Sequence, residues 1–113
     1  MDVKVLNATG SGSFAAIGAG FDWCANNSAT FNIKVITASL GDSGQYTNAT
    51  CPVTINPAIN NALNRDIFVD AASGNNGWLA GISYPACAPG VTSVGAVYDG
   101  NVGPKLGLFS PTL

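Results

Sequence analysis

The sequence predicts an α/β domain built on a partial parallel sheet of about four strands, with helices on one face. Four β-branched, apolar runs closed by Gly, Ser or Asn predict the strands, and apolar residues at helical spacing lie between the first three runs. The predicted strands cover residues 3–6, 33–40, 67–72 and 91–98. Because single helices alternate with strands, right-handed crossovers in sequential order would place both helices on the same face.

Two amphipathic stretches predict the helices. Residues 13–27 form the first, with Ser11 or Ser13 as its N-cap. The second begins with Asn56 as its cap and Pro57 as its first helical residue, where proline is tolerated because the N–H needs no partner. The apolar faces consist of Phe14, Ile17, Gly18, Phe21 and Cys24 in the first helix and of Ala58, Ile59, Ala62 and Leu63 in the second.

The second predicted strand is largely apolar on both of its faces. One face carries Ile33, Val35 and Thr37, and the other carries Lys34, Ile36 and Ala38. Such strands are typical of parallel sheets that are covered on both sides. Since the predicted helices cover only one side, residues 1–113 are interpreted as part of a larger domain.

The composition excludes several classes of protein. Hydrophobic residues make up 47% of the chain and charged residues 9%, which excludes a disordered protein. Four Lys plus Arg stand against six Asp plus Glu without a basic run, so neither nucleic acid nor an anionic membrane is expected as a partner. The first residues lack the pattern of a signal peptide, and no apolar run approaches the roughly 20 residues of a membrane span.

Three cysteines, Cys24, Cys51 and Cys87, are too dispersed for a CxxC zinc or redox motif. Their odd number leaves at least one unpaired within the chain. Buried or free thiols and a single disulfide in an oxidising compartment are the two interpretations that remain.

Three turns of small residues follow the first three predicted strands. They cover residues 9–12, 39–42 and 73–77. In open parallel sheets the ligand crevice lies outside the carboxyl ends of the strands, so these turns are expected to meet there. Glycine permits close backbone approach, so two of them can pair with an extended peptide, with Asn75 pointing between them. A phosphate cradle is the weaker alternative, because Gly10 to Gly12 lack the lysine of a P-loop.

These motifs occur in an order that resembles the middle of a subtilisin-like serine protease, from about Val3 to Ser110. Val-Lys-Val-Leu at 3–6 followed by Gly-Ser-Gly at 10–12 is similar to that family's VKVL and GSG segments. Residues 36–41 are similar to its INMSLGG strand, residues 71–77 to AAAGNEG, and residues 84–86 and 94–97 to YPA and VGAV. The resemblance implies that the chain is a slice of a three-layer subtilisin-like fold and acts on a polypeptide substrate.

The resemblance also implies a role for individual residues. Asn75 would donate a hydrogen bond to the tetrahedral oxyanion. The resemblance also implies a set of substrate-binding residues. They would form the two strands that hold the substrate, the walls and base of the primary specificity pocket, and an apolar subsite. These residues are Gly10, Ser11, Gly12, Phe14, Ile17, Ser39, Leu40, Gly41, Ala72, Ser73, Gly74, Tyr84, Pro85 and Ala86. Each has an ordinary structural alternative: Phe14, Ile17 and Leu40 suit a core, and Asn75 suits a left-handed turn.

The sequence departs from the family in the catalytic triad. No histidine occurs among the 113 residues, and the family's serine and aspartate motifs are expected to follow and precede them. We therefore expect a segment of a serine endopeptidase that is inactive by itself. The alternative is a noncatalytic module that binds peptides or self-associates through its uncovered sheet face. Asp42 replaces a usual glycine and is interpreted as a solvated loop residue.

Further expectations concern the cysteines, metals and location. Cys51 precedes a helix that starts at the carboxyl edge of the sheet and Cys87 lies in a loop at that edge, whereas Cys24 falls near the opposite edge. A Cys51–Cys87 disulfide is therefore preferred. No cofactor or strong metal site is expected, although some relatives hold a weak calcium ion near the positions of Ala86 and Val91. The family implies an extracellular enzyme.

Overall fold

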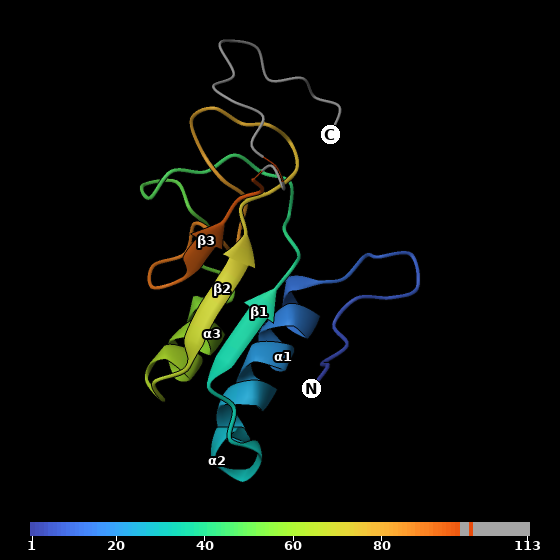
Figure 1. The fold of residues 1–113 in the computed structure, drawn as a ribbon, viewed down its shortest axis with the longest axis vertical. Coiled ribbons are helices and arrows are strands. Elements are labelled where there is room, and N and C mark those ends of the chain that lie inside the picture. The colour runs from blue at the N-terminus through green and yellow to red at the C-terminus, as the bar shows by residue number, and fades with distance from the viewer. Residues whose placement is uncertain (98–99, 101–113) are drawn as a thin grey trace.

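The computed structural model describes residues 1–97 and residue 100, and in this part of the chain it shows a small α/β fold (Figure 1). The strands are β1 (Val35–Ala38), β2 (Phe68–Ala72) and β3 (Thr92–Val94). They form one parallel sheet in the order β1-β2-β3, with Val35 opposite Phe68 and Asp70 opposite Thr92. The predicted parallel α/β architecture is confirmed. The last predicted strand, 91–98, is shorter than expected, because residues 91 and 95–97 lie outside β3, and its last residue lies outside the described residues.

The helices are α1 (Phe14–Asn26), the short α2 (Ser28–Phe31) and α3 (Asn56–Leu63). Ser13 is the N-cap of α1, because its Oγ accepts a hydrogen bond of 3.1 Å from the Ala16 N–H. The prediction for α3 was wrong by one residue: Ile55 is the N-cap and Asn56 is already helical. The Asn56 side chain is engaged elsewhere, since its Oδ1 accepts a hydrogen bond from the Tyr84 hydroxyl.

Residues 3–6 do not form the predicted first strand, so the described sheet has three strands rather than about four. A side chain at Gly20 of α1 would come within 2.6 Å of Val5, so this segment packs closely on the helix. A groove of about 570 Å³ separates it from β1. A strand needs a hydrogen-bonding neighbour as well as an apolar pattern, and residues 3–6 have no such neighbour among the described residues.

Helices α1 and α3 cover one face of the sheet (Figure 1). The core between these layers includes Ile17, Phe21, Ile59, Val69 and Ala71, all buried. On the opposite face Val35, Phe68 and Val94 are 53%, 51% and 52% exposed. Within the part of the chain that the structure describes, the sheet is therefore covered on one side only, as the sequence predicts. Among the described residues, no helix is long and apolar enough to cross a membrane.

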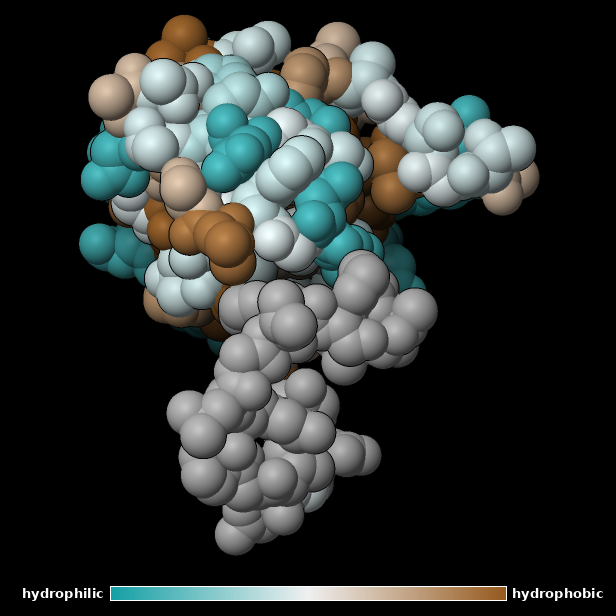
Figure 2. Space-filling model, turned by 90° about the horizontal axis from the view of Figure 1, so that it is seen from above, coloured by the Kyte–Doolittle hydropathy of each residue, from teal (hydrophilic) through white to brown (hydrophobic). Residues whose placement is uncertain are grey.

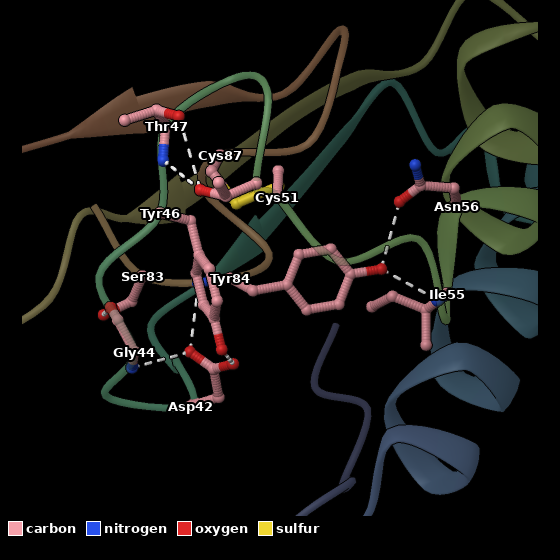
Figure 3. The surroundings of a disulfide bond; sticks show 11 residues. Asp42, Gly44, Tyr46, Thr47, Cys51, Ile55, Asn56, Ser83, Tyr84 and Cys87 are labelled. Atoms are coloured by element: carbon pink, nitrogen blue, oxygen red, sulfur yellow. Dashed lines mark hydrogen bonds between the residues drawn. A yellow bond between two sulfur atoms is a disulfide. The ribbon is translucent and has the colours of Figure 1, made fainter. Parts of the chain in front are cut away.

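A disulfide joins Cys51 to Cys87, with its sulfur atoms 2.02 Å apart (Figure 3). This is the pair that the sequence predicts. The bond connects the loop that precedes α3 to the buried segment that contains Tyr84 and Ala86. Cys24 is a buried free thiol on α1, and its burial raises the pKa of the thiol, which keeps it protonated and unreactive at neutral pH.

Candidate functional site

A groove of about 410 Å³ lies between two of the turns of small residues. One wall is formed by Gly10, Ser11 and Gly12, and the other by Ser39, Leu40 and Gly41. Figure 2 looks onto the end of the molecule where the strands finish and shows the first of these segments on an arm that projects from the body. The structure therefore brings together two of the three predicted turns.

The first wall is organised by Asn7. Its Oδ1 accepts hydrogen bonds from the Thr9 N–H (3.0 Å), the Thr9 hydroxyl (2.7 Å) and the Ser11 N–H (2.9 Å). Gly12 closes the arm on itself, because a Cβ there would lie 2.6 Å from the Val5 carbonyl oxygen. The structural role of Asn7 was not predicted from the sequence, although an asparagine shortly before Thr9 and Gly10 is typical of a turn in which the asparagine side chain accepts backbone hydrogen bonds.

The second wall follows β1 directly and packs on the segment that contains Ser83 and Tyr84. A Cβ at Gly41 would lie 3.2 Å from the Ser83 Cβ, which is tighter than an ordinary contact. Ser39 and Gly41 are exposed and Leu40 is half-buried. Glycine therefore lets the exposed backbone of this wall approach the core without a side chain in between.

The floor of the groove is apolar and belongs to the core at the same time. Phe14, Ile17 and Tyr84 line it. The rings of Phe14 and Tyr84 meet edge to face with their centroids 5.4 Å apart. Ile17 is buried in the main core. Core and subsite are thus compatible interpretations of Phe14 and Ile17, since one side of each contributes to the groove.

Tyr84 connects this floor to α3 (Figure 3). Its hydroxyl accepts a hydrogen bond of 2.8 Å from the Ile55 N–H and donates one of 3.0 Å to Asn56 Oδ1. Pro85 and Ala86, which the resemblance places at the base of the pocket, are buried beside it. Tyr84 lines the groove, whereas Pro85 and Ala86 are not among its lining residues, so their predicted place at the base of the pocket stays a prediction.

The third predicted turn follows β2 and holds Asn75. Gly74 has a φ of +114°, and a Cβ there would lie 2.5 Å from Ser83 Oγ, so glycine is required. Asn75 is exposed and does not adopt a positive φ, so the left-handed turn does not explain this asparagine. Neither Asn75 nor Ala72 and Ser73 is among the described residues that line the groove. Their predicted roles in the site stay predictions.

Asp42 is not the solvated residue that the sequence predicts. It is half-buried, and its carboxylate accepts hydrogen bonds from Tyr46, Gly44 and Tyr84. Its donors come from residues up to 42 positions away, which a single sequence does not reveal. Among the described residues no group of three potential metal-binding side chains occurs, and the calcium site near Ala86 and Val91 stays a prediction.

Two tyrosines near the groove are expected to make the free energy of unfolding of the protein depend on pH in the alkaline range. The hydrogen bond to Asp42 raises the pKa of Tyr46, and burial raises the pKa of Tyr84. Because the folded pKa values exceed the unfolded value of about 10, the stabilisation is complete below about pH 10 and is lost as the pH rises through the folded values.

Titration of the intact protein by tyrosinate absorbance, compared with the variant Tyr46→Phe, checks this expectation. The difference between the two curves should show Tyr46 ionising above about pH 10. The free energy of unfolding of the wild type should fall more steeply in this range than that of the variant. Ionisation of Tyr46 at or below its ordinary pKa would contradict the expectation.

Comparison with known proteins relates this geometry to one family. The sequence profile of the Subtilase family matches residues 1–110. Subtilisin Savinase of Lederbergia lenta is 39% identical over 99 residues, which cover 88% of this chain and 33% of that protein. A cuticle-degrading serine protease of Arthrobotrys oligospora is 38% identical over 108 residues, or 96% of this chain and 24% of that protein.

A solved structure shares the fold. The S41 psychrophilic protease superimposes with a TM-score of 0.64 at 28% sequence identity, over 79% of this chain and 28% of that one. The chain thus spans a third or less of the length of these relatives.

Proposed function

This chain belongs to the subtilase family, and we propose that it supplies the substrate-binding strands and one oxyanion donor of a subtilisin-like serine endopeptidase. The observation that carries the proposal is the groove with Gly10 to Gly12 on one wall and Ser39 to Gly41 on the other. Gly10 to Gly12, Ser39 and Gly41 are exposed residues with small side chains or none, and Leu40 is half-buried between the last two. Such accessible backbone is what an extended peptide needs in order to add a strand.

Each part of the site has a chemical task in this proposal. The backbone of the two walls holds the substrate chain in an extended conformation, and the apolar floor with Phe14 receives a side chain upstream of the cut. Asn75 donates a hydrogen bond to the oxygen that becomes negatively charged in the tetrahedral transition state. Ala72, Ser73 and Gly74 form a further wall of the specificity pocket beside it.

The nucleophile and the general base have to come from outside these residues. A serine protease of this kind needs an imidazole to accept the proton of the attacking serine, and the chain contains no histidine. Residues 1–113 are therefore inert by themselves in this proposal, and the intact enzyme joins them to a serine, a histidine and an aspartate.

Hydrolysis of casein tests this proposal. The intact protein is expected to cleave casein and to lose activity with a serine-directed sulfonyl fluoride, whereas residues 1–113 alone should cleave nothing. Hydrolysis by residues 1–113 that disappears in the variant Asn75→Ala would contradict the proposal. An intact protein that does not cleave casein would contradict it as well.

The proposed enzyme works outside the cell. The Cys51–Cys87 disulfide supports this location, because such bonds persist in oxidising compartments.

A second candidate function rests on a different observation, the uncovered face of the sheet. Val35, Phe68 and Val94 are each about half exposed there, and parallel sheets are normally covered on both sides. A noncatalytic module would bury this face against a peptide or a second copy. Sedimentation that shows a concentration-dependent dimer, lost in the variant Phe68→Lys, would favour this candidate over the protease.

A further inference from the structure

Asp42 occupies the position directly after the second wall of the groove, and both of its carboxylate oxygens accept hydrogen bonds (Figure 3). Oδ1 accepts from the Gly44 N–H at 3.0 Å and from the Tyr84 N–H at 3.2 Å. Oδ2 accepts from the Tyr46 hydroxyl at 2.9 Å. All three donors belong to the chain itself, so the carboxylate stabilises the structure around the groove.

The Asp42 backbone also contacts the same buried residue. Its N–H donates a hydrogen bond of 3.1 Å to the Tyr84 carbonyl oxygen, so that Asp42 and Tyr84 are joined through both the main chain and the carboxylate. Tyr84 is completely buried and is fixed to the start of α3 by its hydroxyl. The wall that contains Ser39 to Gly41 is thereby tied at its end to the rigid core.

Further hydrogen bonds connect the residues around Asp42 to the turn that holds Asn75. The Ser83 hydroxyl donates to the Gly44 carbonyl oxygen at 3.2 Å, and the Ser83 N–H donates to the Ser73 carbonyl oxygen at 2.9 Å. Tyr46 pairs with Ile82 in an antiparallel bridge. Asp42 thus lies at the junction of the segments that follow β1 and β2.

We propose that Asp42 is a positioning residue of the substrate cleft: its carboxylate holds the wall formed by Ser39, Leu40 and Gly41 against Tyr84, so that this wall is already extended when substrate arrives. The inference rests on the proposed function. A wall that needs no ordering on binding loses less conformational entropy, and this benefit grows with the length of the peptide that pairs with it. A direct contact of Asp42 with a cationic side chain of the substrate is the competing account, and the hydrogen bonds to both oxygens argue against it.

The test compares two substitutions in the intact protease, with enzyme concentrations set by active-site titration. Asp42→Ala removes all three side-chain hydrogen bonds. Asp42→Asn can keep all three, since its oxygen accepts from the two N–H groups and its amide donates to the Tyr46 hydroxyl. Asp2→Ala, at an exposed aspartate that does not line the groove, is the matched control. The substrates are a tetrapeptide anilide and an ester of a single amino acid, each with a phenylalanine and a lysine version.

Asp42→Ala is expected to lower kcat/KM for the tetrapeptide about tenfold, mainly through KM, because the wall must then be ordered on binding, and an ordering cost of this kind corresponds to about a factor of ten. The ester does not pair with the wall, so its loss should stay below about twofold. Asp42→Asn and Asp2→Ala should stay within about twofold of the wild type on every substrate. Equal losses on both lengths would overturn the proposal, since a general loss of structure does not distinguish them. A loss in Asp42→Asn confined to the lysine substrates would also overturn it and assign charge recognition instead.

Two further measurements keep the proposal testable. If Asp42→Ala does not fold, Tyr46→Phe removes one of the three hydrogen bonds, and the absence of any selective loss on the tetrapeptide would overturn the proposal. If the wild type cleaves neither substrate, the proposed function fails, and amide hydrogen exchange decides on Asp42 separately. The backbone N–H of residue 42 should then exchange faster in Asp42→Ala than in Asp42→Asn, and equal rates would overturn the positioning role.

Discussion

Replacing Asn75 by alanine in the intact enzyme is expected to lower kcat by about 10² to 10³-fold while KM changes little, which is the loss known for such a donor in subtilisin, a member of the same family. The reason is that the side-chain amide contributes only when the carbonyl oxygen becomes negatively charged. A donor of this kind stabilises the transition state and leaves the binding of the substrate unchanged.

Asn76→Ala is the matched control for this prediction, because Asn76 is exposed in the same turn and differs from Asn75 only by its position. It should leave kcat within about twofold, as surface substitutions usually do. The structure sharpens the expectation, since Asn75 does not adopt a positive φ and its backbone has no need for asparagine. Equal losses in the two variants would assign Asn75 a structural role only.

Removing the disulfide by the double substitution of Cys51 and Cys87 with alanine is expected to lower the free energy of unfolding of the intact protein by about 3 to 4 kcal/mol. The bond closes a loop between residues 36 positions apart, and the cross-link limits the conformations of the unfolded chain. This loop contains the start of α3 and Tyr84, which are joined by the hydrogen bond from the Ile55 N–H to the Tyr84 hydroxyl, so the floor of the groove should loosen when the bond is removed. Urea unfolding measures the change.

A reducing agent provides the control for this experiment. It should lower the stability of the wild type to that of the double variant and leave the variant itself unchanged. The substitution Cys24→Ala, which keeps the disulfide, separates the loss of the bond from the loss of a buried thiol. A double variant that is as stable as the wild type would show that the cross-link contributes nothing to folding.

Local patterns in the sequence were sufficient to predict most of the fold. The apolar run at 67–72 became β2 and the stretch at 13–27 became α1, because burial of an apolar face and a serine cap are both visible in consecutive residues. Residues 3–6 carry the same kind of pattern without forming a strand. Whether an extended segment pairs depends on what lies beside it, and the sequence of one segment does not contain this information.

The candidate site likewise contains residues that local sequence predicts and residues whose roles depend on distant parts of the chain. The two walls could be predicted from their glycines. At Gly12 and Gly41 neighbouring atoms approach the backbone so closely that they leave little room for a side chain, and glycine is visible in the sequence. Asp42 and Asn56 were misjudged, since both bind Tyr84, which lies 42 and 28 positions further along the chain and is recognised as their partner only in the folded protein. Local rules assign an aspartate in a loop to solvent and an asparagine before proline to a cap, and tertiary hydrogen bonds overrode both.

The most direct test of the account is a crystal structure of the intact enzyme with a peptide aldehyde, which forms a tetrahedral adduct with an active-site serine. We predict that the peptide lies extended between Gly10 to Gly12 and Ser39 to Gly41, with the oxygen of the adduct about 2.7 to 3.1 Å from the Asn75 side-chain nitrogen. A peptide bound outside this groove, or an adduct oxygen that Asn75 does not reach, would contradict the central claim.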